Sequence, residues 1–499
     1  MWPINWPHLY GNPPQAGIAA DFKSAASASS ATAPESHSMT PLESVRPIVH
    51  PRANLRDDLD HALPRLAHHG QDGGRDAPDG RDPSPRRLHP RGSLDAAAEM
   101  GESRKMPDPT RRRSPRTRLR VGDLLPARRS LLAALAAAAA AAGCGSTSSG
   151  SQGSPPSSWT AIGAGATHSL AVDSKGSLWG WGNNAWGQVG DGSVTMRTAP
   201  AESLNGFTAV AGGGKHSLGA SGVGLLSWGD DSLDQLGDGG GSGHVTIPTA
   251  LGFPAVTAVS AGDYHSLALK TDGTLWAFGD NSQGQLGIGS TTTRSVPTQV
   301  GTSTYRSVSA GGNHSLGVQT DGTLWAWGDN SYGELGDGTT TPKLSPEQIG
   351  TDTDFASVST GEVHTVAVKT DGTLWAWGDN SFGELGDGST TPRLSPEQIG
   401  TDTDFASASA GNAFTVAVKT DGTLWTWGSN SYGQLGDGTA TAMRPSPAQI
   451  GSGFASVSAG AYHVVALKTD GTLWAWGNNS YGQVGDGTTT NRPSPVQVK

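Results

Sequence analysis

The sequence of 499 residues predicts an all-β fold: a seven-bladed β-propeller built from four-stranded antiparallel blades, preceded by a disordered N-terminal region. Two observations lead to this prediction. Residues 159–499 repeat one pattern seven times at intervals of 47 to 50 residues, and helical periodicity is absent from them. A repeat of this length cannot bury its own apolar face, so neighbouring repeats must stack on one another.

Four short strands are expected in each repeat, and residues 355–399 show them most clearly. Runs of apolar and β-branched residues at 356–359, 364–369 and 373–377 predict the first three strands, and an Asp-Gly turn joins the second to the third. Alternation puts Trp375 and Trp377 on the same face of the third strand. A loop rich in Gly, Asn, Asp, Ser and Thr follows. The fourth strand is predicted to open at Pro396, where the missing N–H does least harm.

These repeats resemble the regulator-of-chromosome-condensation repeat family. The resemblance rests on Gly-x-x-His-Ser-Leu-Ala-Leu, Asp-Gly-x-Leu-Trp-x-Trp-Gly and Asn-x-x-Gly-Gln-Leu-Gly-x-Gly, and it covers residues 159–499. It implies a seven-bladed propeller. Members of the family include a nuclear guanine-nucleotide exchange factor, ubiquitin-ligase accessory domains, a plant ultraviolet receptor and a secreted bacterial β-lactamase inhibitor. The resemblance therefore predicts the fold and leaves the function open.

Charge argues against nucleic-acid binding, and the repeat spacing argues against nucleotide exchange. Residues 144–499 hold 14 Lys and Arg against 29 Asp and Glu, a net charge of −15. A protein that binds phosphate backbones needs a basic surface, so no nucleic-acid partner is expected. An exchange factor needs a protruding wedge, and the near-constant repeat spacing leaves no room for a long insertion.

The segment before the repeats has the pattern of an export signal. A basic stretch precedes an apolar run at 131–143, which ends in Ala141-Ala142-Gly143-Cys144. This order is typical of a secretory signal, and 13 residues are too few to span a bilayer. Cys144, the only cysteine, stands where a bacterial lipoprotein box carries its lipidated thiol. We therefore predict a signal peptide at 106–143 and a Gly/Ser linker at 144–158. The propeller is then lipid-anchored to a bacterial membrane in the cell envelope, or secreted, and Arg128-Arg129 leaves the general and twin-arginine routes open.

Residues 1–105 lack periodicity and mix Arg, His, Pro, Asp and Gly. We expect them to be disordered if they are translated. The alternative is that translation begins at Met100 or Met106 and that this upstream segment is mis-annotated.

Histidine recurs once per repeat, at His168, His216, His265, His314, His364 and His463. A ring of imidazoles would suit a metal, but repeat six has Phe414 at this position, so a structural role is predicted. The Gly-Asp-Asn and Gly-Asp-Gly loops lack the alternating carboxylates of a calcium loop. No catalytic motif is present, and we expect no enzyme activity, no metal and no cofactor.

A variable position two residues before each Gln/Glu-Leu/Val-Gly is the candidate binding site. It is occupied by Trp186, Leu233, Gln283, Tyr332, Phe382, Tyr432 and Tyr481. The five aromatic residues form the candidate binding rim, because exposed rings anchor partners well; the alternative is that each ring packs against the next blade. The sequence thus predicts an exported, membrane-tethered, monomeric interaction module for a protein or glycan partner. The alternatives are an enzyme inhibitor, a carbohydrate-binding propeller or an exchange factor.

The export hypothesis makes a direct prediction. Mass spectrometry of the mature protein should find an acylated Cys144 as its first residue. Cys144→Ser should release the protein from membranes, because each buried CH₂ of the acyl chains contributes about 0.8 kcal/mol of anchoring. A cytosolic species that retains residues 131–143 would contradict the hypothesis.

Overall fold

The computed structural model describes residues 156, 158–241 and 243–498. Cys144, the upstream segment 1–105, the signal segment 106–143 and all of the linker except residues 156 and 158 lie outside the described residues. Within the described part, no helix is long and apolar enough to cross a membrane.

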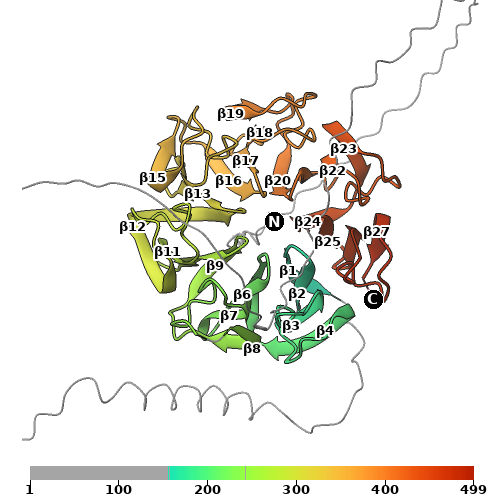
Figure 1. The fold of residues 1–499 in the computed structure, drawn as a ribbon. Coiled ribbons are helices and arrows are strands. Elements are labelled where there is room, and N and C mark those ends of the chain that lie inside the picture. The colour runs from blue at the N-terminus through green and yellow to red at the C-terminus, as the bar shows by residue number, and fades with distance from the viewer. Residues whose placement is uncertain (1–155, 157, 242, 499) are drawn as a thin grey trace, which may run out of the picture. The chain divides into compact units, whose positions relative to one another are not determined.

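The described chain consists of 27 strands, paired antiparallel in chain order (Figure 1). Blades 1 to 3 contain β1 (Trp159–Ala164), β2 (His168–Asp173), β3 (Ser177–Gly182), β4 (Arg197–Asn205), β5 (Phe207–Gly212), β6 (His216–Ser221), β7 (Gly224–Asp230), β8 (His244–Ala250), β9 (Val256–Ala261), β10 (His265–Lys270), β11 (Thr274–Gly279) and β12 (Arg294–Ala310). Blades 4 and 5 add β13 (His314–Gln319), β14 (Leu324–Gly328), β15 (Lys343–Ile349), β16 (Phe355–Thr360), β17 (His364–Lys369), β18 (Leu374–Gly378) and β19 (Arg393–Gln398). Blades 6 and 7 are formed by β20 (Phe405–Ala410), β21 (Phe414–Lys419), β22 (Leu424–Ser429), β23 (Met443–Gly451), β24 (Phe454–Ala459), β25 (His463–Lys468), β26 (Leu473–Gly477) and β27 (Arg492–Gln497).

The predicted seven-bladed propeller is confirmed. Each blade places its first strand at the centre of the ring and its fourth at the periphery (Figure 1). Strand β12 is 17 residues long and serves two blades, as the outer strand of blade 3 and the inner strand of blade 4. These two blades therefore form one seven-stranded sheet, and the strand count is one fewer than seven blades of four would give.

The predicted start of the fourth strand was wrong. In blade 5 this strand begins at Arg393, which pairs with Gly378. Pro396 lies within the strand, beside a register shift that precedes the next pair, Ala376 with Glu397. An outermost strand tolerates proline inside it, because one of its edges has no ladder to donate to.

The hydrophobic core is divided among the seven contacts between blades. In one such cluster, Leu324 and Leu335 of blade 4 pack against Phe355 and Trp377 of blade 5. The ring at the position of Trp377 is fully buried in every blade: Trp181, Trp228, Phe278, Trp327, Trp377, Trp427 and Trp476. A blade alone would leave half of each cluster exposed, which explains why the repeats must form a ring.

One backbone carbonyl joins each blade to the next. The carbonyl of Gln188 in blade 1 accepts hydrogen bonds from Trp228 Nε1 at 2.9 Å and from Ser217 Oγ at 2.8 Å, both in blade 2. Since that hydroxyl proton is used, Ser217 Oγ accepts from His168 Nε2, 2.8 Å away in blade 1. We call this set the interblade joint.

The six histidines are part of these joints, as predicted. Each is buried, and its Nε2 lies 2.8 to 3.4 Å from a Ser or Thr hydroxyl of the next blade. Burial lowers the pKa of His168 to about 3 and that of His265 to about 4. The imidazoles are therefore neutral at pH 7 and serve as hydrogen-bond donors in the scaffold.

The ring closes between blades 7 and 1 through the same joint. Ser169 Oγ lies 2.8 Å from His463 Nε2 and donates to the carbonyl of Gln483, which also accepts from Trp181 Nε1. Trp159 and Val498, near the two ends of the described chain, belong to one core cluster. Closure thus uses packing and side-chain hydrogen bonds, without exchange of a strand.

The joint between blades 6 and 7 lacks its histidine. Phe414 replaces it, and Val464 of blade 7 stands where the other blades have Ser or Thr. Both residues are fully buried and belong to the same core cluster. The tryptophan bond is kept, from Trp476 Nε1 to the carbonyl of Gln434 at 3.0 Å. A polar pair has been replaced by an apolar pair, which leaves no buried donor unsatisfied.

This exchange can be tested by reversing it. Phe414→His alone should lower the free energy of unfolding by about 1–3 kcal/mol, because a buried Nε2 donor has no acceptor. The double variant Phe414→His/Val464→Ser rebuilds the joint. In urea unfolding it should therefore cost at least about 1 kcal/mol less than the sum of the two single variants. Additive effects would show that the joint contributes no hydrogen-bond energy.

Candidate functional site

Two sets of loops share one face of the propeller. The inner loops connect the first strand of each blade to the second: 165–167, 213–215, 262–264, 311–313, 361–363, 411–413 and 460–462. The outer loops connect the third strand to the fourth: 183–196, 231–243, 280–293, 329–342, 379–392, 430–442 and 478–491. In an antiparallel blade both connections lie at the same end of the sheet. We call this end the loop face.

The five residues of the candidate binding rim all lie in outer loops and are partly exposed. Their exposed fractions are 37% for Trp186, 51% for Tyr332, 46% for Phe382, 39% for Tyr432 and 44% for Tyr481. Leu233 holds the same position in blade 2 and is 40% exposed. Rings this accessible are positioned to contact a partner and still retain some packing.

Neighbouring loops support the rim. Tyr432 contacts the ring of Tyr462, from the inner loop of blade 7, at 5.1 Å between centroids. Lys215 Nζ lies 5.4 Å from the ring centroid of Trp186. These contacts connect the rim to the inner loops, so the loop face is one surface from its periphery to its centre.

Internal hydrogen bonds fix the outer loops. In blade 5, Asn380 Nδ2 donates to Asp387 Oδ1 at 3.1 Å and to the carbonyl of Thr391, while its Oδ1 accepts from the amide of Leu385. Asp387 also accepts from Arg393 Nε at 3.0 Å, and these donors lower its pKa although burial alone would raise it. The aspartates of the Gly-Asp-Gly loops are thus engaged in turns and ion pairs. No cluster of three metal-ligating side chains occurs in 158–241 or 243–498.

The outer loops have a one-sided charge. Their sequences contain thirteen Asp and Glu residues and neither Lys nor Arg. The nearest cations stand at the start of the fourth strands, where Arg197, Lys343, Arg393, Arg444 and Arg492 each pair with an outer-loop aspartate. A surface of this sign disfavours phosphate backbones.

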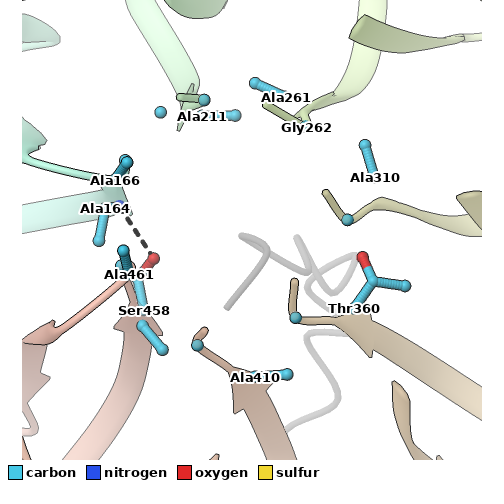
Figure 2. A pocket seen from close by; sticks show the side chains of 18 of the residues that line it. Ala164, Ala166, Ala211, Ala261, Gly262, Ala310, Thr360, Ala410, Ser458 and Ala461 are labelled. Atoms are coloured by element: carbon cyan, nitrogen blue, oxygen red, sulfur yellow. Dashed lines mark hydrogen bonds between the residues drawn. The ribbon is translucent and has the colours of Figure 1, made fainter. Parts of the chain in front are cut away.

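A narrow channel runs through the centre of the ring. Its wall is mostly Gly, Ala, Ser and Thr from all seven blades, with Val210, Asp263, Glu362 and Asn412 as the exceptions, and its volume is about 120 Å³ (Figure 2). Ser458 Oγ accepts from the amide of Ala164 at 3.0 Å, and a similar bond links Ser260 to Ala310. The small side chains let the inner strands approach each other closely.

Two carboxyl groups meet at the mouth of this channel. Asp263 and Glu362 belong to the inner loops of blades 3 and 5, and their side chains are hydrogen-bonded to each other. Gly312 of the intervening blade makes this possible, because a Cβ there would come within 3.0 Å of Glu362 Oε1. Burial, reinforced by the charge of Glu362, raises the pKa of Asp263 to about 7. Burial also raises the pKa of Glu362, so the pair keeps a shared proton to a pH well above the usual range of a carboxyl group.

Sequence reasoning missed this pair. The equivalent inner-loop residues elsewhere are Ala166, Gly214, Gly312, Asn412 and Ala461. An alignment of the seven repeats would have shown two acids among small or neutral residues. Their contact depends on the ring geometry that puts blades 3 and 5 on either side of a glycine.

The repeats match known family models. Residues 302–499 match the RCC1-like domain, and residues 175–220, 224–269 and 272–318 match the regulator of chromosome condensation (RCC1) repeat. A second description of that repeat matches 159–188 and 256–285.

Curated relatives match over short segments. Protein pim1 of Schizosaccharomyces pombe is 34% identical over 87 residues, which are 15% of this chain and 16% of that protein. The protein RCC2 homolog of Xenopus laevis is 35% identical over 96 residues, 18% of this chain and 19% of that protein. The chain thus spans less than a fifth of the length of these relatives.

Solved structures match over the whole propeller. Human WBSCR16 superimposes with a TM-score of 0.59 at 22% identity, over 65% of this chain and 94% of that chain. Prp20p from Saccharomyces cerevisiae also gives 0.59 at 22% identity, over 66% and 87%. At this identity the likeness shows the fold alone.

The paired carboxyls generate a prediction. In Asp263→Asn the side-chain NH₂ group can donate a hydrogen bond to Glu362, so the contact no longer needs a bound proton. The folded-state pKa of Asp263 lies above its unfolded value of 3.8, so the stability that this carboxyl gives at low pH is lost as pH rises through about 7. The variant should therefore match the wild type in urea unfolding at pH 4 and exceed it by about 1–2 kcal/mol at pH 8, after a discount for partial exposure. An equal difference at both pH values would exclude a shared proton.

The repeated sequence, the seven blades joined in a closed ring and the matches across residues 159–499 all point the same way: the propeller of this chain belongs to the regulator of chromosome condensation (RCC1) repeat family.

Proposed function

We propose that the propeller is a non-catalytic protein-interaction module that binds its partner on the loop face. The observation that carries the proposal is the candidate binding rim, whose five aromatic side chains are exposed on loops that internal hydrogen bonds hold rigid. Rigid aromatic side chains lose little conformational entropy when a partner covers them, so they concentrate binding energy. A solved relative, Prp20p, is described as binding Gsp1p and histones, both of them proteins.

We further propose that this module works outside the cytoplasm as a monomer, tethered through a lipid on Cys144. The support is the sequence of basic, apolar and Ala-Ala-Gly-Cys segments at residues 106–144. The linker at 144–158, rich in Gly, Ser and Pro, would let the propeller reach a partner near the membrane.

An exchange factor remains the alternative from another class, since Prp20p binds Gsp1p. Such a function requires an element that reaches into the nucleotide site of its partner. The strand connections within 158–241 and 243–498 are alike in length from blade to blade, and none of the outer loops is longer than 14 residues. The inhibitor and carbohydrate-binding alternatives would use the same rim and differ only in the partner.

The rim proposal is tested by Tyr332→Ala/Phe382→Ala in the full chain. The double variant should lose capture of the partner from envelope extracts, identified by crosslinking and mass spectrometry. Its free energy of unfolding should change by less than about 1 kcal/mol, since both side chains are about half exposed.

Val223→Ala is the matched control, because Val223 is 72% exposed in the turn between β6 and β7, at the opposite face. It should leave capture intact. Loss of 3–5 kcal/mol in the rim variant would instead show that its rings are packing residues. A captured glycan would favour the carbohydrate-binding alternative.

A further inference from the structure

The residue two positions after each rim position holds the rim in place. It is Gln188, Gln235, Gln285, Gln434 or Gln483 in five blades, and Glu334 or Glu384 in blades 4 and 5. In every blade its side-chain oxygen accepts a hydrogen bond from the backbone amide of the rim position, at 2.7 to 2.9 Å. The orientation of the exposed side chain therefore depends on this buried Gln or Glu.

The other terminal atom of the side chain differs between the two residue types. Gln285 Nε2 donates to Asp280 Oδ2 at 2.9 Å, and Gln235 Nε2 donates to Asp230 Oδ2 at 3.1 Å. In blades 4 and 5 the aspartate is kept, as Asp329 and Asp379. An ionised glutamate has no hydrogen to donate to it. Only a protonated glutamate could donate to the aspartate as Gln285 Nε2 does in blade 3.

The surroundings of the two glutamates favour the protonated form. Glu334 and Glu384 are almost completely buried, and Glu384 Oε1 has no hydrogen-bond partner among the described residues. The charged groups facing Glu334 are Asp329 in its own blade and Asp379 in the next, and the group facing Glu384 is Asp379. Burial, with these negative neighbours adding to it, raises the pKa of each glutamate to about 7.

We propose that Glu334 and Glu384 make the binding rim pH-sensitive: when protonated they hold the outer loops of blades 4 and 5 closed with Tyr332 and Phe382 in place, and when ionised they release them. This regulation rests on the proposed function of the rim. The regulating ligand is the proton. The other five blades should lack this pH dependence, because their glutamines do not titrate.

The direction of the effect follows from linkage. A closed loop keeps its proton up to about pH 7, whereas an open, solvated loop gives it up near the ordinary glutamate pKa of 4.5. Between these values the closed loop binds more protons than the open loop. Each rise in pH through this window favours opening, and above pH 7 the effect levels off. Acidification therefore orders the two loops.

Hydrogen exchange tests the proposal without a partner. After correction for intrinsic rates, protection of the Tyr332 and Phe382 amides should fall by up to roughly tenfold per pH unit between pH 5 and pH 7, and then stay level. The Tyr432 amide, bonded to Gln434 Oε1, is the internal control and should show no such dependence. In Glu334→Gln/Glu384→Gln both amides should remain protected across the range.

Transplantation provides the converse test. Gln285→Glu places a carboxyl beside Asp280 and should confer the same pH dependence on the amide of Gln283, for which none is expected in the wild type. If the pH dependence persists in the double Gln variant, the proposal is wrong. If the pH dependence is lost in Asp263→Asn, its origin is the carboxyl pair at the channel mouth. These measurements need no partner, so a negative result would contradict the pH dependence and leave the rim proposal standing. A rim variant that still captures the partner would contradict the rim proposal and leave this result standing.

Discussion

A single backbone carbonyl in each outer loop holds the ring together. In most joints it accepts one hydrogen bond from an indole and one from a hydroxyl of the following blade, and the hydroxyl orients a buried histidine. Around this bond the apolar residues of two blades form one cluster, so hydrogen bonding and hydrophobic burial depend on the same blade-to-blade geometry. Without the preceding blade, a tryptophan would lose its acceptor and half of its packing partners together.

The same residue connects the interior of the propeller to its surface. The carbonyl of Glu384 receives Trp427 Nε1 and Thr415 Oγ1 from blade 6, while its carboxyl holds the amide of Phe382 at the rim. A residue two positions from an exposed ring is thus anchored in the interblade joint. This anchoring explains how loops rich in glycine and serine can present aromatic side chains in fixed positions, a condition for tight binding.

Much of this architecture could be predicted from the sequence because the sequence pattern of one blade is repeated seven times. The number of blades, the two faces of the third strand and the structural role of the histidines follow from repeat spacing and from Phe414 in repeat six. The merger of blades 3 and 4 could not be predicted. Strand β12 runs on through residues 301–305, although the shorter connections at 206 and 452–453 interrupt the strand in other blades, so the length of the connection does not decide the outcome. The contact between Asp263 and Glu362 could not be predicted for a different reason: it joins two blades that are not neighbours in sequence.

No strand is exchanged at the closure between blades 7 and 1, and this bears on where the chain ends could be placed by circular permutation. Since that junction is the same joint that connects the other blades, the ring does not depend on where the polypeptide begins. A circularly permuted chain, with the old ends linked and new ends cut between two blades, should rebuild all seven joints. The junction inside β12 is the exception, because a cut there would sever a strand that belongs to two blades. The chain ends can thus be moved to any junction between blades except the one where two blades share a strand.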